Sequence, residues 1–392
     1  MKVAVLGGSS PFTLSLIHAL VESPEPISVS ELSLLGRNEV ALGRVAEYAR
    51  HHMGSRVEAG TNLEVALRGA DAVIQQVRFE GMAGREADEG LAQELGLPSD
   101  ETLGPAALRR ALRSAAPLRE LADAIRRHAA DAWVLNLTNP LSVSTALLHD
   151  RGVARCIGVC ELPTTTARKA AAQLGVELGR AEWECRGLNH RSFISRLQCD
   201  GEDLLERLIR EPDALAAVSD TPLEQVRELG ALPTKYFRLL RGEAYETPGR
   251  ARKLEGLRGH ILAELERAPT DRPASLGQRV TDWYEEAVVP LLAAIASDTE
   301  RRLVVNCMAD DGLVRESLGW VHTGGVRTPT LPLPRPALAE WLERFEAHER
   351  AVLEVVRRPD RERLEQAIAL DPLIPRERRT AALSALEPEL NS

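Results

Sequence analysis

Residues 2–22, KVAVLGGSSPFTLSLIHALVE, indicate how the chain begins to fold. The first six of these residues are mostly apolar and β-branched and end in glycine, as is typical of a buried parallel strand. Residues 13–22 then repeat apolar side chains at helical spacing. The stretch therefore predicts a strand, a tight turn and a helix, which is the first unit of an α/β sheet.

Strand and helix patterns continue to alternate up to about residue 160. Strands are predicted at 31–37, 71–77, 132–140 and 155–160, and helices at 40–52 and 106–129. This alternation requires crossover connections and therefore a parallel sheet. The sequence predicts a Rossmann-like, doubly wound dinucleotide-binding domain over residues 1–160.

The pattern changes in the second half of the chain. Residues 193–208 predict an antiparallel strand, a turn at Asp200-Gly201 and a helix. The remaining predictions are helical segments over 212–275 with loops near 245–250 and 268–274, a helix at 282–297, a strand at 302–308, and long C-terminal helices after the proline-rich stretch 328–336. Residues 161–392 are therefore expected to form an α+β substrate domain.

Composition excludes several classes of protein. The 392 residues carry a net charge of −9, which argues against nucleic acid as a partner. No apolar run approaches the roughly 18–20 residues that span a bilayer, so no membrane partner is expected. The chain enters a strand at once, which leaves no room for a signal peptide. Its five cysteines lack CxxC spacing, which favours a reducing compartment. We expect a cytoplasmic protein.

The first turn departs from the dinucleotide-binding pattern. The motif G-x-G-x-x-G would require three glycines, but the chain has Gly7, Ser9 and Phe12 at those positions. Its place directly after the first strand still favours nucleotide binding over a plain structural turn, because such a turn presents backbone N–H groups and a helix N-terminus to a pyrophosphate. Candidate cofactor-binding residues are Gly7, Gly8, Ser9, Ser10 and Phe12.

Arg37 is a further candidate cofactor-binding residue. An acidic residue usually ends the second strand and accepts the ribose hydroxyls of NAD, but here the strand ends in Gly36-Arg37. Arginine at this position can meet a 2′-phosphate, so NADP is an alternative to NAD. Two other interpretations of Arg37 remain open: it can be a solvated arginine on a loop, or the protein can have lost the cofactor.

Two arginines follow the third strand in 78-RFEGMAGREADEG-90. Arg78 and Arg85 can form bidentate bonds to phosphate or carboxylate, with Asp88 and Glu89 orienting them. The alternative is the ion-paired start of a helix.

Asn139, in 136-NLTNP-140, ends the fourth predicted strand. Its carboxamide can bind a sugar hydroxyl or a nicotinamide, or it can be an ordinary turn residue before proline.

Cys160 and His190 are candidate metal ligands. Cys160 ends the strand of 158-GVCELP-163, and His190 closes GLNH about thirty residues later. A thiolate and an imidazole, completed by substrate oxygens and water, can hold a divalent metal. Buried structural cysteines and histidines are more common. Tyr236, in 232-LPTKYFRLLRG-242, can act as a base if a nearby cation lowers its pKa, or can simply be a packed aromatic residue.

In this order, the motifs resemble those of glycoside hydrolase family 4, whose members depend on NAD and a divalent metal. GGSSPFTLSL is similar to that family's GGGSSYTPEL-type turn, which accounts for Ser9. RFEGMAGREADE is similar to R-x-G-G-M-x-x-R-x-x-D-E, with Glu80 at the first glycine. TNP, GVCELP and GLNH follow at the expected distances. GLNHRSFISRLQCDGEDLL is closest to the 6-phospho-β-glucosidase branch.

Later segments extend the resemblance over nearly the whole chain. LPTKYFRLL resembles P-x-x-Y-L-x-Y-Y, which carries the family's catalytic tyrosine, and QRVTDWYEEAVVPLL resembles R-G-G-A-x-Y-S-E-A-A. VVNCMADDG and IALDPLI resemble the closing motifs V-V-N-x-x-N-x-G and A-L-x-x-P-L. The implied fold is that of the lactate/malate dehydrogenase-like superfamily, and the implied assembly is a homo-oligomer, a dimer or a tetramer, associating through residues 161–392.

The resemblance implies a 6-phospho-β-glucosidase that uses NAD and Mn²⁺ on a small, 6-phosphorylated glycoside. The implied reaction differs from hydrolysis by two carboxylates. Hydride leaves C3 for the cofactor, a base removes the C2 proton, the aglycone is eliminated, water adds, and hydride returns. The implied site consists of metal ligands Cys160 and His190, the base Tyr236, and substrate-binding Arg85, Asn139 and Arg279.

Some residues depart from the family pattern. Glu161 follows the metal cysteine where the family usually has Asn or His, and Val280 and Thr281 replace glycines. These departures leave two alternatives. The first is a degenerate, non-catalytic homologue that binds a nucleotide or sugar phosphate. The second is a 2-hydroxy-acid dehydrogenase of the same fold, which would need a histidine with an aspartate partner.

Overall fold

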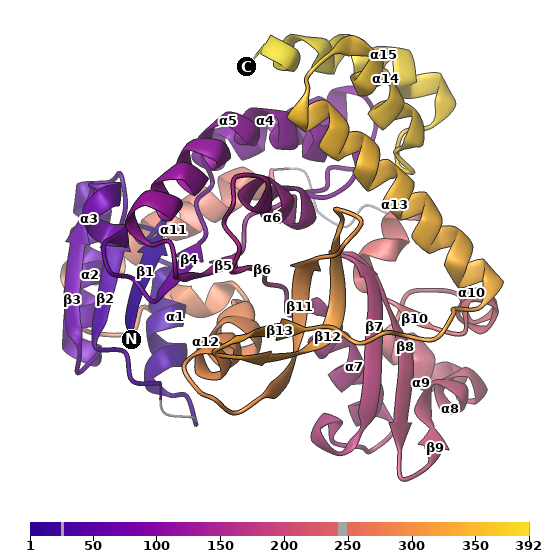
Figure 1. Ribbon diagram of the computed structural model, residues 1–392, viewed down its shortest axis with the longest axis horizontal. Helices are drawn as coiled ribbons and strands as arrows, with labels where there is room; N and C mark the ends of the chain where they lie inside the picture. The colour runs from indigo at the N-terminus through magenta and orange to yellow at the C-terminus, as the bar shows by residue number, and fades with distance from the viewer. Residues whose placement is uncertain (25–26, 242–248, 392) are drawn as a thin grey trace.

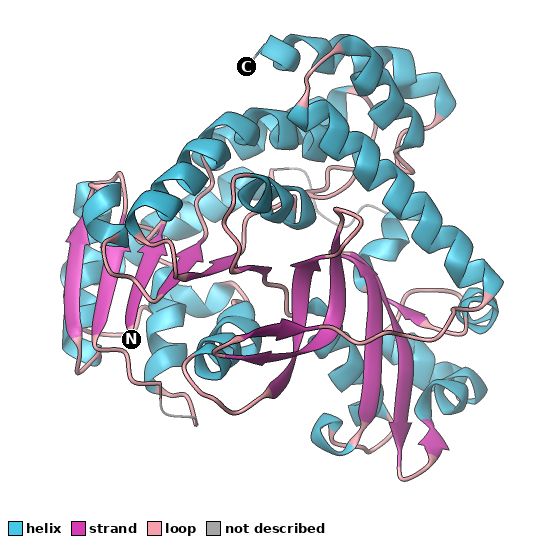
Figure 2. Ribbon diagram, in the orientation of Figure 1, coloured by secondary structure: helices cyan, strands magenta, loops and turns pink. Residues whose placement is uncertain are grey.

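The structure is a computed structural model that describes residues 1–24, 27–241 and 249–391. Within these residues the strands join into one continuous sheet of 13 strands. Helices lie on both faces of the sheet, and the last helices of the chain gather at one end of the molecule, shown in yellow in Figure 1. Figure 2 shows the same view coloured by helix and strand.

The first half of the chain alternates strands and helices. Its elements are β1 (Lys2–Leu6), α1 (Thr13–Val21), β2 (Glu31–Leu35), α2 (Glu39–His52), β3 (Arg56–Gly60), α3 (Leu63–Leu67), β4 (Ala72–Gln75), α4 (Gly81–Glu94), α5 (Gly104–His128), β5 (Trp133–Asn136), α6 (Leu141–Asp150) and β6 (Cys156–Gly158). The strands are parallel, in the order β3-β2-β1-β4-β5-β6. This is the strand order of a doubly wound nucleotide-binding sheet, so the predicted fold of this half is confirmed.

The sequence did not predict β3 and α3. β3 is an edge strand whose side chains are exposed except at Val57 and Glu58, so the alternation that marks a half-buried strand is weak. α3 has five residues, which is too few for a helical period to be recognised. The predicted strand at 31–37 ends earlier, at Leu35, whose carbonyl accepts the N–H groups of Gly7 and Gly8.

The second half of the chain mixes helices with antiparallel strands. Its elements are α7 (Leu162–Gln173), η1 (Leu178–Arg180), β7 (Glu182–Leu188), β8 (Arg191–Cys199), β9 (Glu202–Asp203), α8 (Leu204–Arg210), α9 (Pro212–Val218), α10 (Leu223–Leu229), β10 (Leu232–Pro233), η2 (Lys235–Arg241), α11 (Arg250–Arg267), η3 (Ala274–Gln278), η4 (Tyr284–Val288), α12 (Val289–Ile295), β11 (Arg301–Met308), β12 (Val314–His322), β13 (Gly325–Arg327), α13 (Pro336–Arg357), α14 (Arg361–Leu370), η5 (Arg376–Arg378), α15 (Arg379–Leu386) and η6 (Glu387–Asn391).

The two halves share the sheet. β11 pairs antiparallel with β6 at Asn306 and Gly158, and the sheet continues through β12, β7, β8 and β10. This arrangement confirms the predicted α+β character of the second half. The predicted domain boundary at residue 160 falls just after β6, within the continuous sheet, and stays a prediction.

The β7–β8 hairpin carries the GLNH motif, residues 187–190. Asn189 and His190 form its turn, and His190 has a left-handed backbone with φ of 64°. The sequence analysis missed β7, although Glu182–Cys185 alternates polar with buried apolar side chains. The predicted turn at Asp200-Gly201 is confirmed, with φ of 50° and 84°.

The predicted helix at 282–297 consists of two segments. Tyr284–Val288 forms a π-helical turn, and α12 follows it. Pro290 has no N–H to donate to the carbonyl of Glu286, so a regular α-helix loses a hydrogen bond at this point. The predicted loop at 268–274 lies between α11 and η3 as expected. Most of the predicted loop at 245–250 lies outside the described residues.

Two apolar cores hold the sheet between layers of helices. On one face, α5, α6, α13 and α14 contribute buried residues such as Leu121, Leu147 and Val355. On the other face, α1, α2, α11 and α12 contribute Ile17, Val45 and Leu292. In the part of the chain that the structure describes, none of the helices combines the length and apolar character needed to cross a membrane.

The junction between the two halves leads to a stability prediction. A Cβ atom on Gly158 would lie 2.8 Å from Asn306 Cβ and 2.9 Å from Thr145 Oγ1. We expect Gly158→Ala to lower the free energy of unfolding by about 1–3 kcal/mol through overpacking, measured by urea denaturation. Gly256→Ala, at an exposed position of α11 where nothing lies within 4 Å, is the matched control. Equal effects of the two substitutions would contradict the prediction.

Candidate active site

The predicted site residues lie near one edge of the parallel sheet. The turns after β1, β2, β4, β5 and β6 all leave the carboxyl ends of parallel strands. In open α/β sheets, ligands bind in the crevice outside these ends. The sheet therefore gathers residues from positions 7 to 160 at one edge, and the second half of the chain adds η2, the β7–β8 hairpin and the segment around Arg279.

The β1–α1 turn is packed tightly against β2 and β4. The N–H groups of Gly7 and Gly8 donate to Leu35 O at 3.0 and 2.7 Å. A Cβ on Gly8 would lie 3.0 Å from Leu34 Cβ, and one on Gly36 would lie 2.5 Å from Ser9 Cβ. Glycine at these positions therefore lets the turn approach β2 closely.

Phe12 and Arg279 meet beside this turn. The Arg279 guanidinium lies 4.2 Å from the ring centroid of Phe12 and 5.0 Å from that of Trp283. Burial lowers the pKa of Arg279 to about 10, so the side chain stays charged at neutral pH. The structure thus brings the predicted substrate-binding Arg279 into contact with the predicted cofactor-binding Phe12.

Arg37 remains at the surface at the end of β2. It is exposed and donates to Phe79 O at 3.2 Å. The contact ties the β2 end to the loop after β4 and leaves the guanidinium accessible to solvent.

Arg85 and Asn139 meet on Glu101, which the sequence analysis missed. Arg85 Nη1 lies 3.1 Å from Glu101 Oε1, and Asn139 Nδ2 donates to Oε2 at 3.2 Å. Arg78 also binds this carboxylate. Burial opposes ionisation of Glu101, but Arg85 and Arg78 hold its pKa well below the ordinary value. In the sequence, Glu101 is one acidic residue in a loop, and nothing there marks its partners.

His190 and Tyr236 form an aromatic stack. Their ring centroids lie 3.9 Å apart and their planes differ by 10°. Thr102 Oγ1 lies 2.8 Å from His190 Nδ1. Burial lowers the pKa of His190 to about 3, so the imidazole is neutral and Nδ1 is engaged by Thr102. Nε2 is therefore the ring nitrogen that can bind a further group.

Tyr236 also packs against the apolar cluster that contains Cys160. The thiol belongs to a small buried cluster with Leu141 and Leu162, and Tyr236 lies against this cluster. Burial, together with the carboxylates of Glu161 and Glu316, raises the pKa of Cys160 well above its ordinary value. Three segments distant in sequence therefore converge on the Tyr236 ring.

A buried carboxylate fixes the hairpin that carries His190. Glu316 of β12 accepts hydrogen bonds from Asn189 Nδ2 at 3.1 Å, Asn306 Nδ2 at 3.0 Å and Ser192 Oγ at 2.6 Å. Its side chain is fully buried, and burial raises the pKa of Glu316. The sequence analysis quoted the segment of Asn306 but missed Glu316.

No cluster of three or more His, Cys, Asp or Glu side chains arranged to hold a metal ion occurs in the described ranges. Any metal bound at Cys160 and His190 would therefore need further donors from substrate or water, as the sequence analysis expected.

Two models of one protein family match this chain. The family 4 glycosyl hydrolase model matches residues 2–176, and the model of the family 4 glycosyl hydrolase C-terminal domain matches residues 185–374. The chain belongs to glycosyl hydrolase family 4. This membership confirms the resemblance derived from the motifs.

Family 4 relatives align over almost the full chain. A probable 6-phospho-β-glucosidase of Bacillus subtilis is 25% identical over 96% of this chain and 92% of its own length. A 6-phospho-β-glucosidase of Thermotoga maritima is 25% identical over 96% of this chain and 94% of its own. Maltose-6′-phosphate glucosidase of Bacillus subtilis is 24% identical over 78% of this chain and 75% of its own.

Solved structures show the same fold. The Thermotoga maritima 6-phospho-β-glucosidase, crystallised with manganese, NAD⁺ and glucose-6-phosphate, superposes with a TM-score of 0.88 at 24% identity, covering 99% of this chain and 98% of that one. Lactate dehydrogenase of Eimeria maxima superposes with a TM-score of 0.56 at 14% identity, over 92% and 96% of the two chains. The predicted relation to the lactate/malate dehydrogenase fold is confirmed.

The arginines around Glu101 lead to a pH prediction. We expect Glu101→Gln to lower the free energy of unfolding by about 2–3 kcal/mol at pH 7, because Arg78 and Arg85 lose a charged acceptor. The folded-state pKa of Glu101 is depressed, so its stabilisation is fully present above the unfolded pKa of about 4.3 and is lost as pH falls through the folded pKa.

The measurement is urea denaturation of the native chain and the variant from pH 7 down to pH 3. The difference in free energy of unfolding between the native chain and Glu101→Gln should be largest at pH 7 and should disappear in acid. Glu94→Gln, at an exposed position of the same helix as Arg85, is the control and should show no such difference. A difference that widens in acid would refute the assignment.

Proposed function

We propose that the protein is a 6-phospho-β-glucosidase that uses NAD and Mn²⁺. The observation that carries the proposal is the position of the Tyr236 ring, which stacks on His190 and packs against the cluster of Cys160. Its family membership and the names of its two full-length relatives support the substrate class.

The β1–α1 turn fits a dinucleotide. Gly7 has φ of 95°, and the glycines let the backbone of the turn lie close to β2. Gly7, Gly8, Ser9, Ser10 and Phe12 would hold the cofactor, and the bound nicotinamide would accept and return the substrate hydride. The exposed Arg37 supports NADP as an alternative form, because its guanidinium can pair with a 2′-phosphate.

The donor set around Tyr236 fits a divalent metal. His190 is neutral, with Nδ1 engaged by Thr102, as second-shell bonds to metal-binding histidines usually are. Asn189 Oδ1 is buried without a hydrogen-bond partner among the described residues. Cys160 would have to lose its proton on binding, which a metal promotes. A bound metal would polarise the substrate carbonyl.

The chain's own residues would then bind and deprotonate the substrate. Tyr236 would remove the C2 proton, and the Lys235 ammonium lies over its ring, 5.6 Å from the centroid. Asn139 would orient sugar hydroxyls, while Arg85 and Arg279 would bind the 6-phosphate. Burial raises the pKa of Glu161, the residue next to Cys160.

The two alternative functions have distinct signatures. The described residues do include a buried His348–Asp371 pair, with 3.2 Å between His348 Nε2 and Asp371 Oδ2. Both side chains are at most 2% exposed, so the pair does not offer a substrate the accessible histidine of a hydroxy-acid dehydrogenase. A non-catalytic homologue would bind NAD and sugar phosphates without turnover.

We also propose a cytoplasmic location and a homo-oligomeric assembly, a dimer or a tetramer. The five cysteines are free, which suits a reducing compartment.

The catalytic proposal is tested with 4-nitrophenyl 6-phospho-β-glucoside. We expect hydrolysis to require both NAD⁺ and Mn²⁺ and to fall at least about tenfold in kcat/KM without the 6-phosphate. Tyr236→Phe should lower kcat by about 10²–10⁴-fold while NAD binding is kept. Full turnover in excess chelator would exclude the mechanism. Net reduction of NAD⁺ by lactate or malate would favour the dehydrogenase.

The bond between Thr102 and His190 leads to a binding prediction. We expect Thr102→Val to weaken Mn²⁺ binding by about 10–100-fold, because His190 loses the partner that fixes its ring. Thr102→Ser keeps the hydroxyl and should bind Mn²⁺ like the native chain. Mn²⁺ titration followed by electron paramagnetic resonance measures the affinity independently of activity. Equal affinities of the two variants would contradict the role of Thr102.

A further inference from the structure

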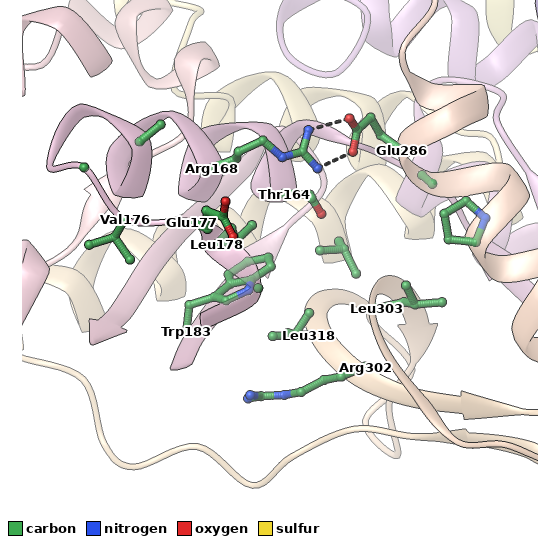
Figure 3. A pocket seen from close by; sticks show the side chains of 16 residues that line it. Thr164, Arg168, Val176, Glu177, Leu178, Trp183, Glu286, Arg302, Leu303 and Leu318 are labelled. Carbon is green, nitrogen blue, oxygen red and sulfur yellow. Dashed lines mark hydrogen bonds and ion pairs between the residues drawn. The ribbon is translucent and has the colours of Figure 1, made fainter. Parts of the chain in front are cut away.

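Two cavities of the described chain differ in how well their polar side chains are satisfied. An open groove of about 740 Å³ lies on the sheet between α7 and the segment η4–α12 (Figure 3). Arg168 and Glu286, at one end of this groove, already bind each other through two hydrogen bonds. A second cavity of about 10 Å³ lies inside the protein where α5, α6 and α13 meet, and all the residues that line it are buried. This internal cavity contains a polar atom that is not satisfied.

His348 of α13 contributes the unsatisfied atom. Its side chain is 2% exposed, and its Nε2 lies 3.2 Å from Asp371 Oδ2. Its Nδ1 is buried and has no hydrogen-bond partner within residues 1–24, 27–241 and 249–391. A buried ring nitrogen without a partner is costly, so a ligand that bonds Nδ1 stabilises the folded chain.

The neighbouring carboxylate makes Nδ1 an acceptor. Burial opposes ionisation of Asp371, but His348 and backbone N–H groups hold the pKa of this carboxyl below its ordinary value. An ionised Asp371 favours a proton on the nitrogen that faces it, which is Nε2 of His348. In a neutral imidazole the other nitrogen then accepts a hydrogen bond. The cavity therefore calls for a small hydrogen-bond donor at Nδ1.

The two carboxylates that line the cavity already have donors. Glu349 accepts from Ser142 Oγ at 2.6 Å and from Arg191 Nη2 at 2.5 Å. Asp371 accepts from Gly104 N at 2.7 Å. Among the residues that the structure describes, no three His, Cys, Asp or Glu side chains are arranged to hold a metal ion, and those of this cavity are no exception. A cation is therefore not the ligand that fits.

Water matches the cavity in size and chemistry. A buried water needs roughly 10–15 Å³ of space and two to four polar partners. The cavity of about 10 Å³ therefore holds one molecule. Thr102 lines the same cavity as His348, and in a space of this size one water reaches both residues.

Thr102 connects the cavity to the candidate metal ligand. In the proposed function the metal binds Nε2 of His190, so Nδ1 carries the proton and donates it to Thr102 Oγ1, 2.8 Å away. The Thr102 hydroxyl then has its own hydrogen to donate, and the water accepts it. The water in turn donates to His348 Nδ1. Along this path each hydrogen meets an acceptor.

We propose that the cavity binds one water molecule that bridges Thr102 Oγ1 and His348 Nδ1, and that His348 is thereby a positioning residue for His190. The inference rests on the proposed function, in which His190 binds the metal. The same helix also holds the hairpin of His190 directly, because Glu349 binds Arg191. Two consecutive residues of α13 therefore fix the imidazole, one through a buried ion pair and one through the water.

The water site is tested by a crystal structure of the full chain that resolves ordered waters. We expect one water within about 2.7–3.2 Å of both His348 Nδ1 and Thr102 Oγ1. A dry cavity, or a water that bonds one of these atoms and not the other, would overturn the inference.

The positioning role is tested by Mn²⁺ titration followed by electron paramagnetic resonance. The asparagine amide lies near the position of Nδ1, so His348→Asn should keep the water and bind Mn²⁺ like the native chain. The longer glutamine places its amide near Nε2, so His348→Gln should keep the contact with Asp371 and lose the bond to the water. We expect His348→Gln to weaken Mn²⁺ binding by about 3–10-fold, less than loss of the Thr102 hydroxyl itself.

The order of the two variants makes the result decisive. A merely structural His348 would tolerate glutamine better than asparagine, so that order, or equal affinities, would overturn the positioning role. His260→Gln, at an exposed position of α11 on the opposite face of the sheet, should change nothing. Circular dichroism checks that each variant folds. A native chain that holds the water but binds no Mn²⁺ would refute the proposed metal site and leave the water site standing.

The converse result separates the two proposals in the other direction. A native chain that binds Mn²⁺ with a dry cavity would refute this inference and leave the proposed function intact.

Discussion

The relative position of Cys160 and His190 depends on one buried carboxylate. Glu316 accepts from Asn306, which reaches β6 through Gly158 O, and from Asn189, which precedes His190 in the hairpin turn. Cys160 follows Gly158 by two residues, so both candidate ligands are connected to the same anchor. Burying a carboxylate is costly, and three donors to Glu316 offset that cost. Glu316 thus fixes the position of the β7–β8 hairpin relative to β6, where the two halves of the sheet meet.

A second carboxylate has the same role at the other side of the site. Glu101 gathers Arg78, Arg85 and Asn139, which leave the sheet after two different strands. The neighbouring Thr102 bonds His190, so one short loop connects the arginines to the candidate metal ligand. Arg85 also pairs with Glu89, so these two arginines are balanced by two carboxylates, and an anionic substrate group would have to compete with them for the guanidinium groups.

Much of the fold could be predicted because its signals are local. The β1–α1 unit, β4, α5 and β5 are apolar runs or helical repeats, and periodicity found them. The sequence analysis missed β7, although polar and buried apolar residues alternate at its start. The hydrogen bonds that fix the candidate site could not be predicted for a different reason. Glu316 and Ser192 are 124 residues apart in sequence, and Thr102 and His190 are 88 apart. Only the fold brings them together, and Tyr236 stood out through its family motif rather than its chemistry.

The left-handed backbone of His190 restricts which ligand that position can carry. Non-glycine residues rarely adopt a φ of 64°, and histidine, asparagine and aspartate tolerate it best. Cysteine or glutamate there would strain the hairpin before any metal bound. Metal preference in this chain is therefore more open to redesign at Cys160 than at the hairpin, where backbone conformation already limits the chemistry to a few side chains.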